Sequence, residues 1–295
     1  MNQTKPFIWV TFFFTFFLTQ VTLEAQEPVI LDSKMKPGIS NDMRIEELKV
    51  RWKKAALENC PGVPCVTTPP APSFTCGTST VTDIDGNSYN TVLIGTQCWT
   101  KENLKVTKYN DGSPITPDAT GTSTGSGIGE MWSTRNSGAY TIYEHNNSNV
   151  TTYGLLYNWF AATDAKKLCP DGWHVPSDVE WTNLILHLDG NAIISNYTQS
   201  LIAGGMLKST SNLWNVATTP SPGTNSSGFT GIPGGFRSSA GAFVQKGDNA
   251  YFWSTTTYPT SAFSAYFKDL NYSNNSFDRD WLNKTVGMSI RCIKN

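Results

Sequence analysis

Charged side chains are scarce in this sequence. Only 15% of its 295 residues are Asp, Glu, Lys or Arg, and 22 basic residues nearly balance 23 acidic ones. Apart from a short stretch at 49–54 there is no basic run, so nucleic acid is not an expected partner, because that affinity comes largely from Lys and Arg on phosphates. Gly, Ser, Thr and Asn are abundant instead. This composition is typical of an extracellular, loop-rich β protein.

Histidine is rarer still, with His145, His174 and His187 as its only occurrences. The run Gly-Thr-Ser-Thr-Gly at 121–125 has the spacing of a serine-hydrolase nucleophile elbow, which must join a strand to a helix. Here it lies inside a long Gly, Ser and Thr loop at 112–129, so we do not expect a hydrolase triad. With no other catalytic constellation, the sequence favours a non-catalytic protein.

Long apolar segments are missing, apart from one near the start of the chain. Residues 1–25 combine Lys5, an apolar run at 7–18 and a Leu-Glu-Ala sequence before Gln26, which is the pattern of a cleavable signal peptide. The apolar run is too short to span a membrane. We therefore expect an exported protein, secreted or held at the cell surface, with no membrane span in the mature chain.

Six cysteines in an exported chain indicate disulfides rather than a metal site. Many pairings are open to six cysteines, and the sequence alone does not choose among them. Proximity along the chain, followed by elimination, favours three bridges: Cys60–Cys65, Cys76–Cys98 around a predicted hairpin, and Cys169–Cys292.

The clearest local signal is a helix that begins near Ser177. The run Ser-Asp-Val-Glu at 177–180 is a capping box, in which the serine hydroxyl accepts from the Glu180 amide and the glutamate accepts from the Ser177 amide. Gly190 is expected to end the helix. Glu180 is therefore interpreted as a cap rather than a catalytic acid. Apolar positions at roughly helical spacing follow the cap: Val179, Leu184, Ile185 and Leu188, with Trp181 beside them.

We divide the chain into three parts: a signal peptide at 1–25, a helical segment with a Pro-rich linker at 26–75, and a main domain at 76–295. Residues 40–59 have the pattern of an amphipathic helix, with Ile45, Leu48 and Trp52 on one face. Packing back on the main domain is the favoured interpretation of this helix. Self-association and docking to a partner are the alternatives.

The main domain is predicted to have short, mostly antiparallel strands, two main helices and long loops. An Asp-Gly turn at 85–86 predicts a hairpin between 81–84 and 89–94. The acidic opening of that turn imitates a calcium loop, but its glycine is misplaced and its twelfth position is Ile94, so a hairpin is favoured. Further elements are predicted at 153–162 (a buried helix) and, as strands, at 235–238, 242–245, 251–256, 264–270 and 288–293.

Six runs of the main domain together resemble a known family. They are TVLIGTQCWTKENLKV (91–106), YGLLYNWFAA (153–162), LCPDGWHVPSDVEWTNL (168–184), NSSGFTGIPGGFR (225–237), YFWSTT (251–256) and SIRCIK (289–294). The family that they resemble, over about 81–294, is the Fibrobacter succinogenes major paralogous domain. Family members are exported bacterial proteins, and the resemblance implies an α+β fold similar to C-type lectin-like domains and to formylglycine-generating enzymes. By analogy with lectins it also implies a Cys169–Cys292 bridge. Fold analogy alone does not transfer function.

The sequence departs from both analogous groups at their functional residues. The Glu-Pro-Asn, Gln-Pro-Asp and Trp-Asn-Asp motifs of the lectin calcium site are absent, so a bound calcium would need another site. Formylglycine-generating enzymes need a reactive cysteine pair for copper, and every cysteine here has a plausible disulfide partner. We therefore expect no cofactor, and an oxidoreductase-like enzyme of that fold is the least favoured alternative.

Aromatic and amide side chains supply the candidate ligand-binding residues, because flat rings stack on sugars and amides bond to hydroxyls. Tryptophans in polar loops are better candidates than those in regular elements, which usually fill cores. The candidates are Trp132, Trp214, Trp281 and Asn225, whereas core positions are predicted for Tyr157, Trp159, Trp173, Trp181 and Trp253.

Three other polar residues receive structural interpretations. His174, just before the capped helix, is expected to be hydrogen-bonded rather than a general base. Arg237 and Arg291 lie in apolar strand contexts and are expected to neutralise buried carboxylates or to cap backbone carbonyls.

These observations predict an exported, non-catalytic binding or surface-interaction domain whose ligand is a glycan or another surface polymer. The alternative from a different class is a structural subunit of a cell-surface assembly, with the helix at 40–59 as its docking element.

Overall fold

The computed structural model describes Val50 and residues 73–118, 132–218 and 221–295. The chain divides into two compact units, and the second, Ser73–Asn295, contains the architecture described below. The predicted signal peptide, the Cys60–Cys65 bridge and, except for Val50, the helix at 40–59 lie outside the described residues.

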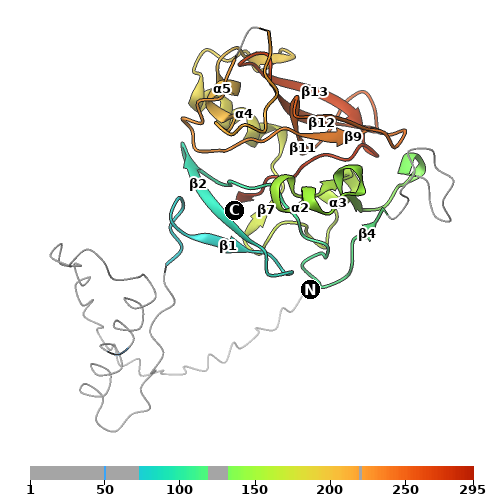
Figure 1. Cartoon of the computed structure of the whole chain (residues 1–295). Coiled ribbons are helices and arrows are strands. Elements are labelled where there is room, and N and C mark those ends of the chain that lie inside the picture. The colour runs from blue at the N-terminus through green and yellow to red at the C-terminus, as the bar shows by residue number, and fades with distance from the viewer. Residues whose placement is uncertain (1–49, 51–72, 119–131, 219–220) are drawn as a thin grey trace, which may run out of the picture. The chain divides into compact units, whose positions relative to one another are not determined.

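Three sheets form the framework of this unit, and the fold is α+β with mostly β structure (Figure 1). The five-stranded sheet has the order β1 (Thr80–Thr82), β2 (Ser88–Ile94), β3 (Gln97–Thr100), β14 (Ile293–Lys294) and β7 (Trp173–His174). The six-stranded sheet has the order β10 (Phe243–Lys246), β9 (Gly234–Arg237), β11 (Asn249–Thr257), β12 (Ser264–Asn271), β13 (Phe277–Asn283) and β8 (Thr198–Ser200). The three-stranded sheet has the order β4 (Thr116–Pro117), β5 (Ala139–Thr141) and β6 (Leu156–Tyr157).

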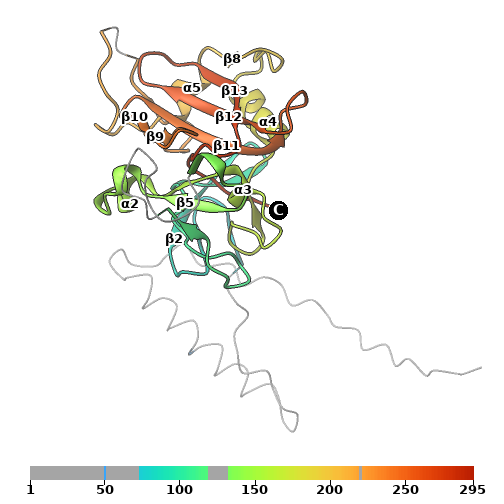
Figure 2. The ribbon, with the colours of Figure 1, turned by 90° about the vertical axis from the view of Figure 1, so that its right-hand side faces the viewer.

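Helices are short and few in the described residues. Figure 2 shows α4 and α5 beside the six-stranded sheet, with α2 and α3 near the smaller strands. The α-helices are α2 (Ser148–Tyr153), α3 (Trp159–Ala162), α4 (Asp178–Leu188) and α5 (Ala203–Leu207), and single 3-10 turns occur at η1 (Trp132–Thr134) and η2 (Tyr143–His145).

The hairpin predicted around Asp85-Gly86 is confirmed as β1 and β2, which pair antiparallel. Asp83 organises its turn, because Oδ1 accepts from the amides of Asp85 and Asn87 while Oδ2 accepts from the Tyr89 hydroxyl at 2.6 Å. Asp83, whose carboxylate resembles a calcium ligand in the sequence, therefore organises the turn. A second tight turn at Gly95 leads into β3, a strand that the sequence patterns did not predict.

The helix predicted from Ser177 is confirmed as α4, and both bonds of its capping box are present. Ser177 Oγ accepts from the Glu180 amide at 3.3 Å, and Glu180 Oε2 accepts from the Ser177 amide at 2.7 Å. Val179 belongs to the apolar spacing that predicts this helix, but its side chain is 66% exposed. The buried face of α4 is made by Trp181, Leu184 and Ile185.

The single helix predicted at 153–162 is wrong. Gly154 ends α2 with φ +74°, and a β carbon there would lie 2.7 Å from the Leu104 carbonyl oxygen, so the chain turns at this glycine. Tyr157 then exchanges two backbone hydrogen bonds with Met288, which keeps it extended in β6. The helix resumes only at α3, where the Asn158 side chain accepts from the Ala161 amide as an N-cap. Tertiary pairing overrides a locally helical pattern here.

The C-terminal strands follow the predicted order, but one strand was not predicted and another is shorter than predicted. β9, β10, β11 and β12 occupy the predicted segments, whereas β13 was missed. The strand predicted at 288–293 is reduced to β14, preceded by isolated bridges at Met288 and Ser289. These bridges tie the chain to Tyr157 and Phe252 and so link the sheets.

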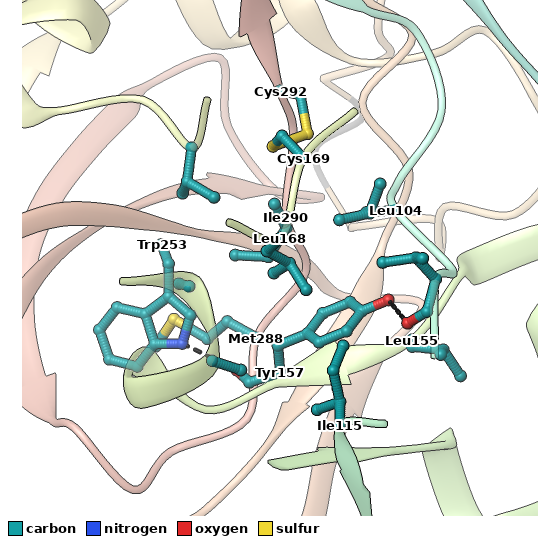
Figure 3. Packing of buried hydrophobic residues seen from close by; sticks show 14 of the residues in the cluster. Leu104, Ile115, Leu155, Tyr157, Leu168, Cys169, Trp253, Met288, Ile290 and Cys292 are labelled. Carbon is teal, nitrogen blue, oxygen red and sulfur yellow. Dashed lines mark hydrogen bonds between the residues drawn. A yellow bond between two sulfur atoms is a disulfide. The ribbon is translucent and has the colours of Figure 1, made fainter. Parts of the chain in front are cut away.

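One of the two core clusters lies around the Cys169–Cys292 disulfide (Figure 3). The Trp253 indole donates to the Tyr157 carbonyl at 3.0 Å, and the Tyr157 hydroxyl donates to the Val106 carbonyl at 2.7 Å. The Cys76–Cys98 bridge is also present, so both predicted disulfides within the described residues are confirmed. The longer bridge closes a 123-residue separation, which corresponds to about 4–5 kcal/mol of loop entropy.

The second core cluster includes residues of α4 and α5 and combines aliphatic side chains with a group of contacting aromatic rings. Trp181 lies beside Trp99, Phe229 and Phe252. Of the aromatic residues predicted to be in the core, four are buried, and Trp159 is half-buried with its indole donating to the Ser254 carbonyl.

Both predicted structural arginines are buried and paired. Arg237 forms an ion pair with Asp118 and donates to Thr141 Oγ1 at 3.3 Å. Arg291 instead caps backbone carbonyls, because its guanidinium donates to the carbonyls of Thr100, Phe229 and Thr230 and to Asn103 Oδ1. Arg237 thus neutralises a buried carboxylate and Arg291 caps backbone carbonyls, which are the two predicted roles.

Candidate functional site

Trp132 does not lie on the surface, contrary to its prediction as a ligand-binding loop residue. Its side chain is 3% exposed, and the Arg237 guanidinium lies 4.6 Å from the ring centroid. The absence of a side chain at Gly287 leaves room for the indole, because a β carbon there would lie 2.9 Å from Trp132 Cζ2. The ring therefore covers a buried ion pair and has no free face for a ligand.

Asn225 is engaged within its own loop. Its Oδ1 accepts from the Thr230 amide at 2.8 Å, and its Nδ2 donates to Thr230 Oγ1 at 3.1 Å. The residue has φ +49°, a conformation that asparagine tolerates better than most residues. Its amide closes a turn, so we do not assign it to the site.

Trp214 lies on the wall of a pocket of about 400 Å³, which we call the Trp214 pocket. The pocket is formed by the segments 208–217 and 221–223 together with Tyr272. Gly223 lets these segments approach closely, because a β carbon there would lie 2.5 Å from the Lys208 carbonyl oxygen. Hydroxyl and amide side chains supply its polar wall: Ser209, Thr210, Ser211, Asn212 and Asn215.

The indole of Trp214 is held in a fixed orientation. Its Nε1 donates to Ser209 Oγ at 3.2 Å, and that hydroxyl also bonds to Ser211 Oγ at 2.8 Å. The ring is only half-buried, packed against the aromatic core cluster. A preoriented ring beside hydroxyl and amide groups suits a ligand that has both apolar C–H faces and hydroxyls.

Lys208 forms the base of the pocket and connects its walls. The side chain is buried, and Nζ donates to the carbonyls of Ser221, Asn271 and Asn274 at 2.6–3.0 Å. Burial lowers the pKa of Lys208 to about 8. All three ammonium donors are therefore used inside the protein, and this lysine shapes the pocket rather than offering a donor to a ligand.

Trp281 contributes to a second aromatic surface, the aromatic ledge, defined by Tyr258, Tyr266 and Trp281. Trp281 is 44% exposed and stacks on Tyr258, with ring centroids 4.6 Å apart and an interplanar angle of 18°. Tyr266 meets Tyr258 edge-on at 5.4 Å. Of the four predicted site residues, the structure thus leaves Trp214 and Trp281 accessible, in two separate places.

The model of the Fibrobacter succinogenes major domain matches residues 92–294, well over half of the chain. The chain belongs to this family. No curated protein and no solved structure matches this chain. The Fibrobacter succinogenes major domain of this chain includes the Trp214 pocket, the aromatic ledge and the Cys169–Cys292 bridge.

His174 of the Fibrobacter succinogenes major domain is hydrogen-bonded, as predicted. Its Nε2 lies 2.6 Å from Glu180 Oε1 and its Nδ1 lies 2.5 Å from Asn295 Oδ1. Burial opposes ionisation of Glu180, but hydrogen bonds from Ser177 and His174 outweigh it, and the pKa of Glu180 falls below its usual value. This cluster joins the start of α4 to the last residue of the domain.

The described part of the domain has no cluster of three or more His, Cys, Asp or Glu side chains arranged to hold a metal ion. All four cysteines within that part are in disulfides. Buried carboxylates do occur at the six-stranded sheet. On one face, Asp178 of α4 bonds to Lys268 and Arg279 of the sheet. On the other face, Asp269 lies opposite Asp278.

The residues of these two surfaces that sequence reasoning missed include Lys208, Tyr258, Tyr266 and Tyr272. A lysine next to a Gly- and Pro-rich loop gives no sign that it will be buried against carbonyls. The tyrosines are different, because Tyr266 lies on β12 and the other two lie in turns next to it. They could have been grouped with Trp281 if β13 had been predicted beside that strand.

Proposed function

We propose that this chain is an exported, non-catalytic binding protein that recognises a glycan through the Trp214 pocket. The observation that carries the proposal is the fixed, half-buried indole beside a wall of hydroxyl and amide groups. Sugar rings present C–H faces to aromatic rings and hydroxyls to amides, and such sites are usually built on loops. The pocket of the Fibrobacter succinogenes major domain has both components on one loop cluster.

A C-type lectin-like arrangement belongs to the same proposal. Its support is the Cys169–Cys292 bridge and the position of β14 between β3 and β7, which puts the last strand of the fold beside one of its first. Because the lectin calcium motifs are absent from the sequence, the proposal assigns the sugar contact to the Trp214 pocket instead. Two disulfides support export to an oxidising compartment. Within the described residues, no helix is both long and apolar enough to cross a membrane.

The experiment is glycan-array binding of the exported chain, residues 26–295, with and without calcium. We expect calcium-independent binding that Trp214→Ala removes, while the exposed apolar residue Leu93, on β2 outside the pocket, serves as the matched control in Leu93→Ala. A folded protein that binds no glycan, or whose binding survives Trp214→Ala, would contradict the proposal.

A specific surface favours the second candidate function, a structural subunit of a cell-surface assembly. Six of the fourteen exposed large hydrophobic side chains in the described residues fall within 186–202, around β8 at the edge of the six-stranded sheet. Apolar patches of this kind often mark subunit contacts. We call these residues the apolar patch: Leu186, Ile193, Ile194, Tyr197, Leu201 and Ile202.

Sedimentation velocity separates this candidate from a monomeric binding protein. If the apolar patch joins subunits, the wild-type chain forms a concentration-dependent oligomer that Leu201→Asp dissociates. Deletion of residues 40–59 tests the N-terminal segment as the docking element instead. A wild-type chain that stays monomeric at high concentration would remove this candidate.

A further inference from the structure

The aromatic ledge exists because α4 covers only part of one face of β12 and β13. Figure 2 shows these two strands side by side with α4 next to them. Leu270 and Phe277 pack in the same core cluster as Trp181 of α4, and Lys268 and Arg279 bond to Asp178, the first residue of that helix. The strand register puts three pairs in a row on this face: Leu270–Phe277, Lys268–Arg279 and Tyr266–Trp281.

The third pair lies beyond the start of α4, where Tyr258 from the turn between β11 and β12 stacks on Trp281. The ledge is therefore a stacked pair, Trp281 on Tyr258, with Tyr266 edge-on to it, on a rigid ladder. Phe263, in the same turn as Tyr258, is 77% exposed. Neither the stack nor the exposed phenylalanine is explained by core packing, because the helix-covered core ends one pair earlier.

The three side chains that define the ledge carry no charge. Arg279 lies 3.7 Å from the Tyr266 ring centroid and donates two hydrogen bonds, at 2.8 and 3.0 Å, to the Asp178 carboxylate, which it shares with Lys268. Asp280 precedes Trp281 and belongs to the opposite face by strand alternation. A neutral aromatic platform favours a ligand with uncharged apolar faces, and pyranose rings have such faces.

The ledge and the Trp214 pocket lie at opposite ends of β12. Tyr272, which lines the pocket, directly follows the strand, and Tyr266 lies six residues earlier on the strand. At about 3.4 Å per residue, the two positions are ~20 Å apart. One molecule of a short sugar would occupy one site, whereas a polysaccharide offers many rings to both.

We infer that the aromatic ledge is a second sugar-binding site and that the protein's ligand is a long, neutral polysaccharide held at the pocket and the ledge together. The inference rests on the proposed function of the pocket. Once one site is occupied, the second binding event is intramolecular, and its effective concentration can raise the overall affinity by about 10²–10⁴. Chain length then becomes what the protein recognises, because only a polymer reaches both sites.

The test is affinity gel electrophoresis of the exported chain in hydroxyethyl cellulose, arabinoxylan and mannan, with calorimetry on the matching trisaccharides, which are too short to reach from the pocket to the ledge. For the bound polymer we expect at least a tenfold higher affinity per trisaccharide unit than for the free trisaccharide. Trp281→Ala should remove this gain and leave trisaccharide binding at the pocket unchanged. Phe263→Ala, in the same turn but outside the stack, is the matched control and should keep the gain.

The outcomes separate the two proposals. If Trp281→Ala binds the polymer as the wild type does while Trp214→Ala abolishes binding, the second site is wrong and the pocket stands. If the folded wild type binds no polymer and no trisaccharide, the proposed function itself fails. Stronger retardation in alginate than in the neutral polymers contradicts the neutral ligand class. Trp281→Phe, which keeps the stack with less area, guards against misfolding and should give an intermediate loss.

Discussion

The two faces of β12 and β13 neutralise buried charge in different ways. On the α4 face, the register partners Lys268 and Arg279 both bond to Asp178, at 2.8 Å from Lys268 Nζ and with two bonds from the guanidinium. On the opposite face, the partners Asp269 and Asp278 are both buried, and within the described residues neither forms an ion pair with a cation. One face pairs opposite charges, and the other brings like charges together.

The pKa values follow this difference. Burial opposes the ionised form of Asp178, yet its bonds to Arg279 and Lys268 outweigh burial and lower its pKa. Burial, followed by the nearby Asp278, raises the pKa of Asp269 to about 7. Asp178, beside the Lys268–Arg279 pair, is therefore held ionised, whereas Asp269, in the next pair of the same two strands, is largely protonated below neutral pH. The comparison shows that charge balance here is set by strand register and not by composition.

Removal of Asp178 should have the largest effect. Asp178→Asn keeps the shape of the side chain but leaves the fully buried Lys268 and the neighbouring Arg279 without a carboxylate. We expect a loss of about 3–5 kcal/mol in the free energy of unfolding, measured by chemical denaturation at pH 7. A loss below about 1 kcal/mol would show that the two cations do not depend on this partner.

The acidic face should make stability fall as pH rises. The folded-state pKa of Asp269, about 7, lies above the ordinary value of about 3.9, so its contribution is full below pH 4 and is lost as pH rises through 7. Between pH 5 and pH 8 this corresponds to a decrease of about 2–3 kcal/mol in the free energy of unfolding.

The matched variant for this prediction is Asp269→Asn, which imitates the protonated acid. Its unfolding free energy, measured by urea denaturation at several pH values, should lack most of that decrease and exceed the wild-type value at pH 8. An identical pH dependence in the wild type and the variant would contradict the assignment of the proton to Asp269.

Replacement of Lys268 should have the smallest effect. In Lys268→Met, Asp178 keeps its two bonds to Arg279, and an apolar chain replaces an ammonium whose pKa burial lowers to about 8. Because Asp178 stays paired with Arg279, the replacement leaves no buried charge without a partner, and we expect a change within about 1 kcal/mol. The loss of unfolding free energy caused by Asp178→Asn should also be smaller when Lys268→Met is already present. Additive losses in the double variant would contradict the ion pair between Lys268 and Asp178.

The parts of the fold that sequence reasoning predicted depend on neighbours in the chain. The capping box at Ser177 and the Asp-Gly hairpin are local, and each was confirmed. The two disulfides followed from hairpin position and elimination, and the family resemblance gave Cys169–Cys292 independently. The helix predicted at 153–162 failed because Tyr157 pairs with Met288, more than a hundred residues away.

The site was predicted in part for the same reason. Trp214 and Trp281 lie in polar surroundings on the surface, as their sequence contexts indicated. Trp132 has an equally polar context but is buried by Arg237, whose position depends on β9 and on Asp118. The opposition of Asp269 and Asp278 depends on a register that no local pattern records. Burial and strand register that depend on strands far apart in the sequence could not be predicted from these local patterns.

The most direct test of the central claim, that the Trp214 pocket binds a sugar, is calorimetric titration of residues 26–295 with the trisaccharide that binds best on the array. The wild type should bind it, and Trp214→Ala should lose at least about tenfold in affinity, the effect of roughly 1.4 kcal/mol. The thermal midpoint of that variant should stay close to the wild-type value, because the ring is only half-buried. Equal affinity in the wild type and in Trp214→Ala would contradict the account.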